Sequence, residues 1–352
     1  MTERVRHIAD RLAESEAALI CADHHLRYLC GYPSNEAWLF ITREAAYFLT
    51  DFRYIEIAEK TVQGAQCRML GNLTEMLAEL VESHGITAVF AEEEVLTAAQ
   101  YRRLSKALPM AEGALDAWLS VLRECKTDEE IRKIEQAQAL AEAAFDHILG
   151  YIREGVTERE VALELEFFMR RAGASRASFD VIAVSGVNGS LPHGIPSDKP
   201  IRRGELVTMD FGAVVDGYLS DMTRTVAVGE VSEHQRLVYD TVLRAQEASL
   251  SVLKAGLTCV EGDAAARRVI EEAGFGAHFG HGTGHGVGLE IHEAPRLSPR
   301  AGDVLLRVGH VVTVAPGIYL PNDCGVRIED MVVITEDGCR NLTHAPKEVI
   351  CL

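Results

Sequence analysis

Several common sequence features are missing from this chain, and their absence narrows the class of protein. There are eight cysteines but no CxxC pair, whereas a zinc ribbon needs paired cysteines and disulfide frameworks are typical of shorter secreted chains. No apolar run approaches the roughly 20 residues of a membrane span. The charged, amphipathic N-terminus lacks the apolar core of a signal peptide. We therefore expect a cytoplasmic protein with reduced thiols.

Positive charge is also scarce. Lysine and arginine number 35 against 53 aspartates and glutamates, which gives a formal net charge of −18. This balance repels nucleic-acid phosphates and acidic membrane surfaces, so we expect neither as a partner. The 352 residues, 47% of them hydrophobic, suffice for one large or two ordinary globular domains.

The most unusual segment is GHGTGHGVGLEIHE, which places His281, His285 and His292 among glycines. It matches neither the G-x-G-x-x-G nor the GK[ST] phosphate motif, and it is not an HExxH zinc motif. The chain also has no GxSxG nucleophile elbow. Metal binding and acid–base chemistry remain open, and His193 in LPHGIPSD adds a further histidine.

Apolar patterning divides the chain into two parts. The segments 17–21, 37–42, 46–50 and 86–91 are typical of strands, and an amphipathic helical pattern precedes the last of them. Strands alternating with helices predict a small α/β domain over residues 1–122. Thr127 and Glu130 form a capping-box signature that opens a helix. This helix begins a second domain over residues 123–352.

The second domain contains an internal repeat. Residues 155–173 align with residues 256–274 at one constant offset, with matching threonine, glutamate and terminal Ala-Gly positions. Each copy is typical of a capped helix that ends in glycine. We interpret the repeat as two related halves with a site between them.

Three carboxylates interrupt apolar strand patterns in this domain. Asp216-Gly217 predicts a two-residue hairpin turn, which places Asp210 opposite Thr223 and puts Asp210 and Asp221 on one face of the sheet. Paired carboxylates among apolar neighbours favour a metal site over simple exposure. Glu329 lies in a third apolar run, GVRIEDMVVI, where one member of the Glu329-Asp330 pair could instead face solvent. A histidine with several carboxylates suits Mn²⁺, Co²⁺, Fe²⁺ or Zn²⁺.

Four segments in this order resemble motifs of the pita-bread metallopeptidases, most closely the Xaa-Pro aminopeptidase and prolidase (Xaa-Pro dipeptidase) branch. They are DFGAVVDGYLSDMTRT, HGTGHGVGLEIHE, VTVAPGIYLP and GVRIED. The first third, with TDFRY, resembles the creatinase-type N-terminal domain of that branch. The resemblance implies an α/β (α+β) protein with this N-terminal domain and a pita-bread catalytic domain of two pseudo-symmetric halves.

The resemblance also implies roles for individual residues. Two divalent ions, with Mn²⁺ expected first, would be held by Asp210, Asp221, His285 and Glu329. The catalytic helpers would be His193 and His292. The residues that shape the substrate pocket would be His281, Tyr319 and Arg327. The implied reaction is metal-assisted hydrolysis of peptides with proline at the second position, in a protein that is often a homodimer.

One position departs from the family pattern. In VTVAPGIY the family carries a glutamate, a ligand of the second ion and general acid/base, where this chain has Ala315. Alanine can neither coordinate a metal nor carry a proton. We therefore expect a weak or empty second metal site and impaired turnover. Because the other motif positions are intact, we favour a deliberate inactivating change in a true peptidase over a natural variant.

Three alternatives stay open. A natural pseudoenzyme that binds peptides without cleaving them would also explain Ala315. An aminopeptidase of other specificity, such as a methionine aminopeptidase, usually lacks the N-terminal domain. Creatinase-type hydrolysis needs no metal, whereas this chain keeps most of a ligand set.

Overall fold

The computed structural model describes residues 1–352, which form two compact units, Met1–Leu122 and Arg123–Leu352. All eight cysteines are free thiols. None of the helices combines the length and the apolar character needed to cross a membrane.

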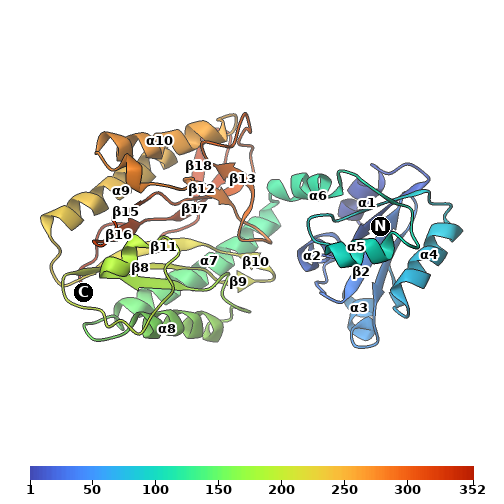
Figure 1. The fold of residues 1–352 in the computed structure, drawn as a ribbon, viewed down its shortest axis with the longest axis horizontal. Coiled ribbons are helices and arrows are strands. Elements are labelled where there is room, and N and C mark those ends of the chain that lie inside the picture. Colours follow the sequence, from blue (N-terminus) through green and yellow to red (C-terminus); the bar gives the residue numbers. More distant parts are fainter. The chain divides into compact units, whose positions relative to one another are not determined.

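The first unit is built on one six-stranded sheet of order β4-β3-β2-β1-β5-β6. Helices lie around this sheet, which contains the strand labelled β2 in Figure 1. Its strands are β1 Glu16–Ile20, β2 Ala37–Thr42, β3 Ala46–Thr50, β4 Gln66–Met69, β5 Ala88–Ala91 and β6 Met110–Ala111. Its helices are α1 Glu3–Ala9, α2 Asp23–Cys30, α3 Ile55–Thr61, α4 Leu73–Ser83, α5 Ala98–Leu104 and α6 Leu115–Glu124, the last of which runs into the second unit. Strands β1, β2 and β3 pair antiparallel, while β4, β5 and β6 each pair parallel to a neighbour.

Apolar side chains on this sheet form the core of the first unit. Leu19, Phe40, Leu49 and Val89 lie on adjacent strands and are fully buried. The predicted strands 37–42 and 46–50 coincide with β2 and β3. Runs of apolar residues therefore located four strands of this sheet, β1, β2, β3 and β5, whereas β4 and β6 were not predicted.

The second unit contains four long helices and several small sheets. The helices are α7 Asp128–Leu149, α8 Glu158–Arg171, α9 Glu233–Val252 and α10 Cys259–Glu272, with short 3₁₀ turns η1 Gly186–Ser190 and η2 Gly276–His278. One sheet has the order β11-β8-β7, from β7 Ile182–Ser185, β8 Glu205–Phe211 and β11 Met222–Val228. A five-stranded sheet has the order β13-β12-β14-β17-β18, from β12 Gly284–Gly286, β13 Glu293–Leu297, β14 Val311–Val314, β17 Asp330–Ile334 and β18 Cys339–Asn341. The two-stranded ribbons are β9 Val214–Val215 with β10 Tyr218–Leu219, and β15 Gly317–Tyr319 with β16 Gly325–Arg327.

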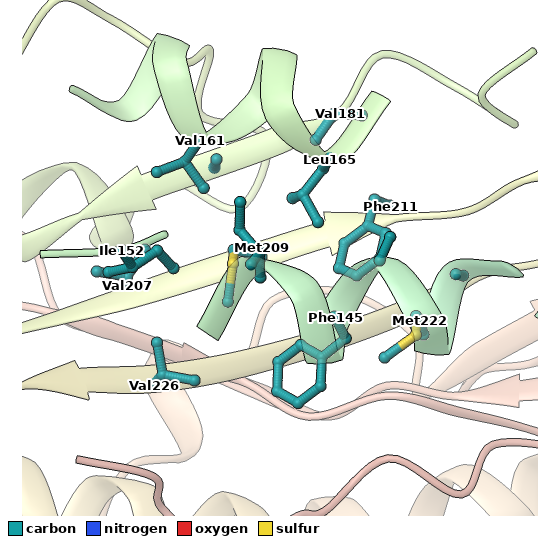
Figure 2. Packing of buried hydrophobic residues seen from close by; sticks show 14 of the residues in the cluster. Phe145, Ile152, Val161, Leu165, Val181, Val207, Met209, Phe211, Met222 and Val226 are labelled. Atoms are coloured by element: carbon teal, nitrogen blue, oxygen red, sulfur yellow. The ribbon is translucent and has the colours of Figure 1, made fainter. Parts of the chain in front are cut away.

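Strand alternation separates the core of this unit from its polar face. Val207, Met209 and Phe211 of β8 point into a cluster that includes Val161 and Leu165 of α8 (Figure 2). The intervening residues of β8 therefore face the opposite side. Asp210 is one of them, and its partner on β11 is Thr223.

The two halves of the unit repeat the same helix signals. Thr157 caps α8 and Thr258 caps α10, and each forms a complete capping box with the glutamate three residues later. The flanking glycines adopt positive φ in both copies, 92° at Gly155 and 84° at Gly256. These matches agree with the repeat seen in the sequence.

The predicted turn at Asp216-Gly217 is confirmed. Both residues have positive φ, 48° and 82°, as a type I′ hairpin turn requires. Val215 pairs with Tyr218, and further along Asp210 pairs with Thr223 as predicted. The hairpin is divided, however, because β9 and β10 form a separate ribbon.

The sequence predicted one continuous strand through Glu329, and this prediction is wrong. The chain forms β16, which ends at Arg327, and β17, which begins at Asp330. Glu329 lies between them and bridges to Thr223 instead. Nor does either member of the Glu329-Asp330 pair face solvent, because Asp330 is fully buried and forms an ion pair with Arg224.

Candidate metal centre

Asp210 and Asp221 reach the site from one face of the β8–β11 hairpin. Asp221 directly precedes β11 and is 4% exposed. Asp210 Oδ2 accepts a hydrogen bond from Arg327 Nη2 at 2.7 Å, whereas its buried Oδ1 has no hydrogen-bond partner. Unpaired buried carboxylate oxygens are costly, so this atom is suited to bind a cation.

His285 is carried by β12, between two glycines that permit close strand packing. A Cβ on Gly284 would lie 1.8 Å from the carbonyl oxygen of Thr313, and one on Gly286 would lie 2.3 Å from that of Ala294. The Nδ1 of His285 lies 3.2 Å from the carbonyl of Gly286, and its Nε2 lies 3.6 Å from Asp221 Oδ2. Since a carbonyl only accepts, Nδ1 carries the proton and Nε2 presents a lone pair to the carboxylates.

Glu329 is held in the same site by hydroxyl groups. Its Oε2 accepts a hydrogen bond from Thr223 Oγ1 at 2.7 Å, and Thr313 also donates to this carboxylate. Asp221, His285 and Glu329 each offer a ligand atom within 4.8 Å of the others. Three of the four predicted ligands therefore converge, and Asp210 joins them through its contact with Asp221.

Burial and the repulsion between like charges shift the pKa values of these residues. Burial, followed by the charges of Glu329 and Asp210, raises the pKa of Asp221 well above its usual range. Burial and Asp210 also raise the pKa of Glu329. Burial and neighbouring His292 lower the pKa of His285 to about 3, so its imidazole is neutral near pH 7. A divalent cation would relieve the carboxylate repulsion and would find a neutral imidazole ligand.

Arg327 connects the carboxylates to the surrounding loops. Besides Asp210, it donates from Nε to Thr223 Oγ1 at 3.1 Å and from Nη1 to Tyr319 Oη at 2.9 Å. Nη1 also donates to the carbonyl of Pro192 at 3.2 Å. Arg327 thus joins Asp210 to Thr223, Tyr319 and the backbone of Pro192.

His281 and Tyr319 continue this hydrogen-bond chain. His281 Nδ1 lies 2.8 Å from the carbonyl of Gly282, and its Nε2 lies 2.9 Å from Tyr319 Oη. Burial lowers the pKa of His281 and raises that of Tyr319. Because the Gly282 carbonyl can only accept, Nδ1 carries the hydrogen of the neutral His281, and Nε2 accepts a hydrogen bond from the Tyr319 hydroxyl.

The two predicted catalytic histidines lie at the exposed edge of the group. The ring of His292 packs edge-on against that of His285, with centroids 4.3 Å apart. His193 is exposed on the loop before β8. Burial, Arg296 and then the charge of His193 lower the pKa of His292, and His193 acts in the same direction on His281. The charge of His193 is therefore felt by both His281 and His292.

Ala315 lies beside the ligand group. Val314 of β14 pairs with Asp330, so the next residues along these strands are Ala315 and Glu329. The Ala315 amide donates to the carbonyl of Thr283 at 2.7 Å, two residues before His285. Ala315 directly follows β14, and strand alternation places it on the same face as Thr313, which contacts both His285 and Glu329.

Sequence reasoning missed Thr223 and Thr313 as parts of the site. The first could have been found from the predicted hairpin register, since Thr223 opposes Asp210. The second lies two residues before Ala315 and therefore shares its strand face. Their hydroxyl groups satisfy the buried Glu329, as buried carboxylates require.

Two family models match this chain. The model of metallopeptidase family M24 matches residues 132–336, and that of the creatinase/prolidase N-terminal domain matches residues 2–125. The chain belongs to the M24 metallopeptidase family. The pita-bread catalytic domain and creatinase-type N-terminal domain expected from the motifs are thus confirmed.

Relatives and solved structures of M24 proteins cover nearly the whole chain. A Xaa-Pro dipeptidase from Pyrococcus horikoshii is 37% identical, over 99% of both chains. The structure of a Xaa-Pro dipeptidase from Bacillus anthracis superposes with a TM-score of 0.96 at 42% identity, covering 99% of both chains. That of an X-Pro aminopeptidase from Thermotoga maritima gives a TM-score of 0.90 at 37% identity, covering 98% of this chain and 100% of the other.

Proposed function

We propose that this M24 scaffold hydrolyses the bond before proline in Xaa-Pro dipeptides or at the N-terminus of longer peptides. The observation that carries the proposal is the convergence of Asp221, His285 and Glu329 within 4.8 Å. The names of the full-length relatives support proline at the second position, in both dipeptidases and an aminopeptidase.

The ligands would be divided between two divalent ions, for which Mn²⁺ is our first choice. Asp210 and Asp221 would hold one ion, His285 the second, and Asp221 and Glu329 would bridge them. Such ions supply Lewis-acid activation of water and of the peptide carbonyl. The buried, unpaired Oδ1 of Asp210 and the neutral imidazole of His285 suit this role.

The remaining side chains would act on the peptide. We propose that His193 and His292 donate hydrogen bonds to the scissile carbonyl, whose oxygen gains charge during hydrolysis. His281, Tyr319 and Arg327 would form the wall that orients the substrate, since they are already joined by hydrogen bonds. We also propose a homodimer, the commonest assembly of soluble proteins.

Ala315 should impair peptide hydrolysis by this chain. It offers neither a ligand on the His285 side nor a group that can carry a proton to the leaving nitrogen. We therefore propose weak binding of the second ion and slow turnover in the present chain. The same residue favours one alternative, a peptide-binding pseudoenzyme on this scaffold.

Restoring a carboxylate separates these possibilities. In Ala315→Glu, we expect Mn²⁺ titration to show two tight ions and Xaa-Pro hydrolysis to rise about 10²- to 10⁴-fold, the usual contribution of a positioned acid–base group. Ala315→Gln is the matched control, because it has nearly the same shape without a proton-carrying group. Rates for dipeptides and longer peptides then separate dipeptidase from aminopeptidase.

Two results would contradict the proposal. If the unaltered chain binds two ions tightly and is fully active, Ala315 does not weaken metal binding or turnover as proposed. An Ala315→Glu protein that binds Xaa-Pro peptides but cleaves none would support the pseudoenzyme instead.

A further inference from the structure

The loop that carries His193 has little regular structure of its own. It follows β7, which ends at Ser185, and contains the short turn η1; the part considered below runs to Ser197, before β8 begins at Glu205. Besides His193, it supplies the Pro192 carbonyl that accepts a hydrogen bond from Arg327. Because the side chain of His193 is exposed, its position depends on how the backbone of this loop is anchored.

Glu158 accepts hydrogen bonds from both ends of this loop. This first residue of α8 is fully buried. Its Oε1 accepts from Ser185 N at 2.7 Å and from Ser185 Oγ at 2.9 Å. Its Oε2 accepts from Ser197 Oγ at 2.6 Å and from Ser197 N at 3.2 Å. Asn188 Nδ2 lies 3.1 Å from both oxygens, so the carboxylate also holds η1.

The donors to Glu158 are neutral groups. Lys199 reaches the carboxylate only through Ser185 Oγ, to which it donates at 2.8 Å, and it forms its ion pair with Glu205. Burying a carboxylate is costly unless its oxygens are fully hydrogen-bonded. Here the loop supplies those hydrogen bonds, so folding of the loop and burial of Glu158 depend on each other.

None of the proposed metal ligands is among these partners. Asp210 lies on β8, Asp221 precedes β11, His285 lies on β12, and Glu329 precedes β17. Loss of the Glu158 contacts should therefore displace His193 without removing a ligand.

We propose that Glu158 is the positioning residue for His193. Its carboxylate closes the loop from Ser185 to Ser197, and thereby sets where the His193 imidazole stands relative to a bound peptide. The inference rests on the proposed function, because that function gives His193 its role. The anchoring of the loop by Glu158 can be measured independently.

Glu158→Gln is the test, with Glu160→Gln as matched control. The glutamine keeps one acceptor oxygen but turns an NH₂ group toward the donors of the loop. Glu160 lies in the same helical turn and is also acidic, but its carboxylate only caps α8 through Thr157. In the Ala315→Glu background, Glu158→Gln should lower kcat about 10²-fold, the effect of a misplacement near 1 Å, while Mn²⁺ affinity is unchanged. Glu160→Gln should leave both unchanged.

A double-mutant cycle distinguishes positioning from general destabilisation. If Glu158 acts through His193, Glu158→Gln combined with His193→Ala should be no slower than His193→Ala alone. Multiplied effects, or a fall in Mn²⁺ affinity parallel to that in kcat, would overturn the proposal.

Hydrogen exchange in the unaltered Ala315 chain tests the anchoring without any turnover. Glu158→Gln should speed exchange of the amides of residues 185–197, and Glu160→Gln should not. Unchanged exchange in Glu158→Gln overturns the inference even if Ala315→Glu is active. If Ala315→Glu is inactive while Glu158→Gln still speeds exchange of residues 185–197, the proposed function is refuted and the anchoring of the loop by Glu158 stands.

Discussion

Glu293 is a buried carboxylate whose charge is balanced by two cations. It directly follows His292, and its carboxylate forms ion pairs with Arg123 Nη2 at 2.6 Å and Lys126 Nζ at 2.5 Å. Burial would raise the pKa of Glu293, but the two cations outweigh it and hold the pKa below its usual value. The network therefore stabilises the start of β13 only while Glu293 is ionised.

Glu293→Gln should destabilise the protein in a pH-dependent manner. Near pH 7 we expect a loss of about 3 kcal/mol, because two buried cations lose their carboxylate. The folded-state pKa is depressed, so this stabilisation is complete above the unfolded-state pKa of about 4.3 and disappears as the pH falls through the lower folded value. Denaturant unfolding from pH 7 to 3 should therefore show a flatter acid dependence in Glu293→Gln.

Glu290→Gln is the control for this network. Glu290 also binds Arg123 at 2.7 Å, but its side chain is 43% exposed, so its removal should cost less than about 1 kcal/mol. Equal losses in the two variants, or an unchanged acid slope in Glu293→Gln, would contradict the assignment.

At the scale of elements, the second helix of each half anchors a loop that bears a histidine. Glu158 does so from α8, and Asp263 does so from α10. Asp263 is 1% exposed and accepts from Thr283 N and Thr283 Oγ1, both at 2.9 Å. It also pairs with Arg267, which donates to the His281 carbonyl at 2.8 Å. The two carboxylates serve similar roles from different positions of the repeat, since Glu158 aligns with Cys259.

Asp263→Asn should release residues 279–285 and leave the His193 loop in place. We expect about 2 kcal/mol of destabilisation, since a charged acceptor of several hydrogen bonds is removed. Hydrogen exchange should accelerate at Thr283 and its neighbours but not within residues 185–197. Glu261→Gln, in the exposed capping box of α10, is the control. Equal acceleration of both loops would indicate general loosening instead.

At the scale of the whole molecule, each unit has its own core. The sheet of the first unit packs around residues such as Phe40, and the helices of the second pack around residues such as Phe145, both fully buried. The proposed metal ligands all belong to the second unit. Stability in the first unit and metal binding in the second should therefore be separable.

Phe40→Ala should lower the stability of the first unit by about 3–5 kcal/mol, because it leaves a cavity in a packed core. Mn²⁺ affinity should not change. Phe145→Ala makes the same truncation in the second unit. In this variant, the unfolding transition that Mn²⁺ stabilises should move to lower temperature. Calorimetry with and without Mn²⁺ measures both, and a single transition shifted equally by both variants would show that the units unfold together.

Patterns confined to a few neighbouring residues determined much of this protein from sequence alone. Runs of apolar residues located β2 and β3, the capping box Thr127–Glu130 located the start of α7, and the Asp216-Gly217 turn set the register that pairs Asp210 with Thr223. These signals are readable because the interactions behind them are local.

Only the tertiary structure decided how distant segments complete the site. Glu329 lies between strands because it bridges to Thr223, 106 residues earlier. Glu158 is buried because a loop some thirty residues later folds over it, with Ser185 27 and Ser197 39 residues away. Asp330 is buried because Arg224, Gln246 and Lys347 surround it. A carboxylate in an apolar run has the same local pattern whether solvent, a metal or a distant donor satisfies it, so its partner emerges only when the chain is folded.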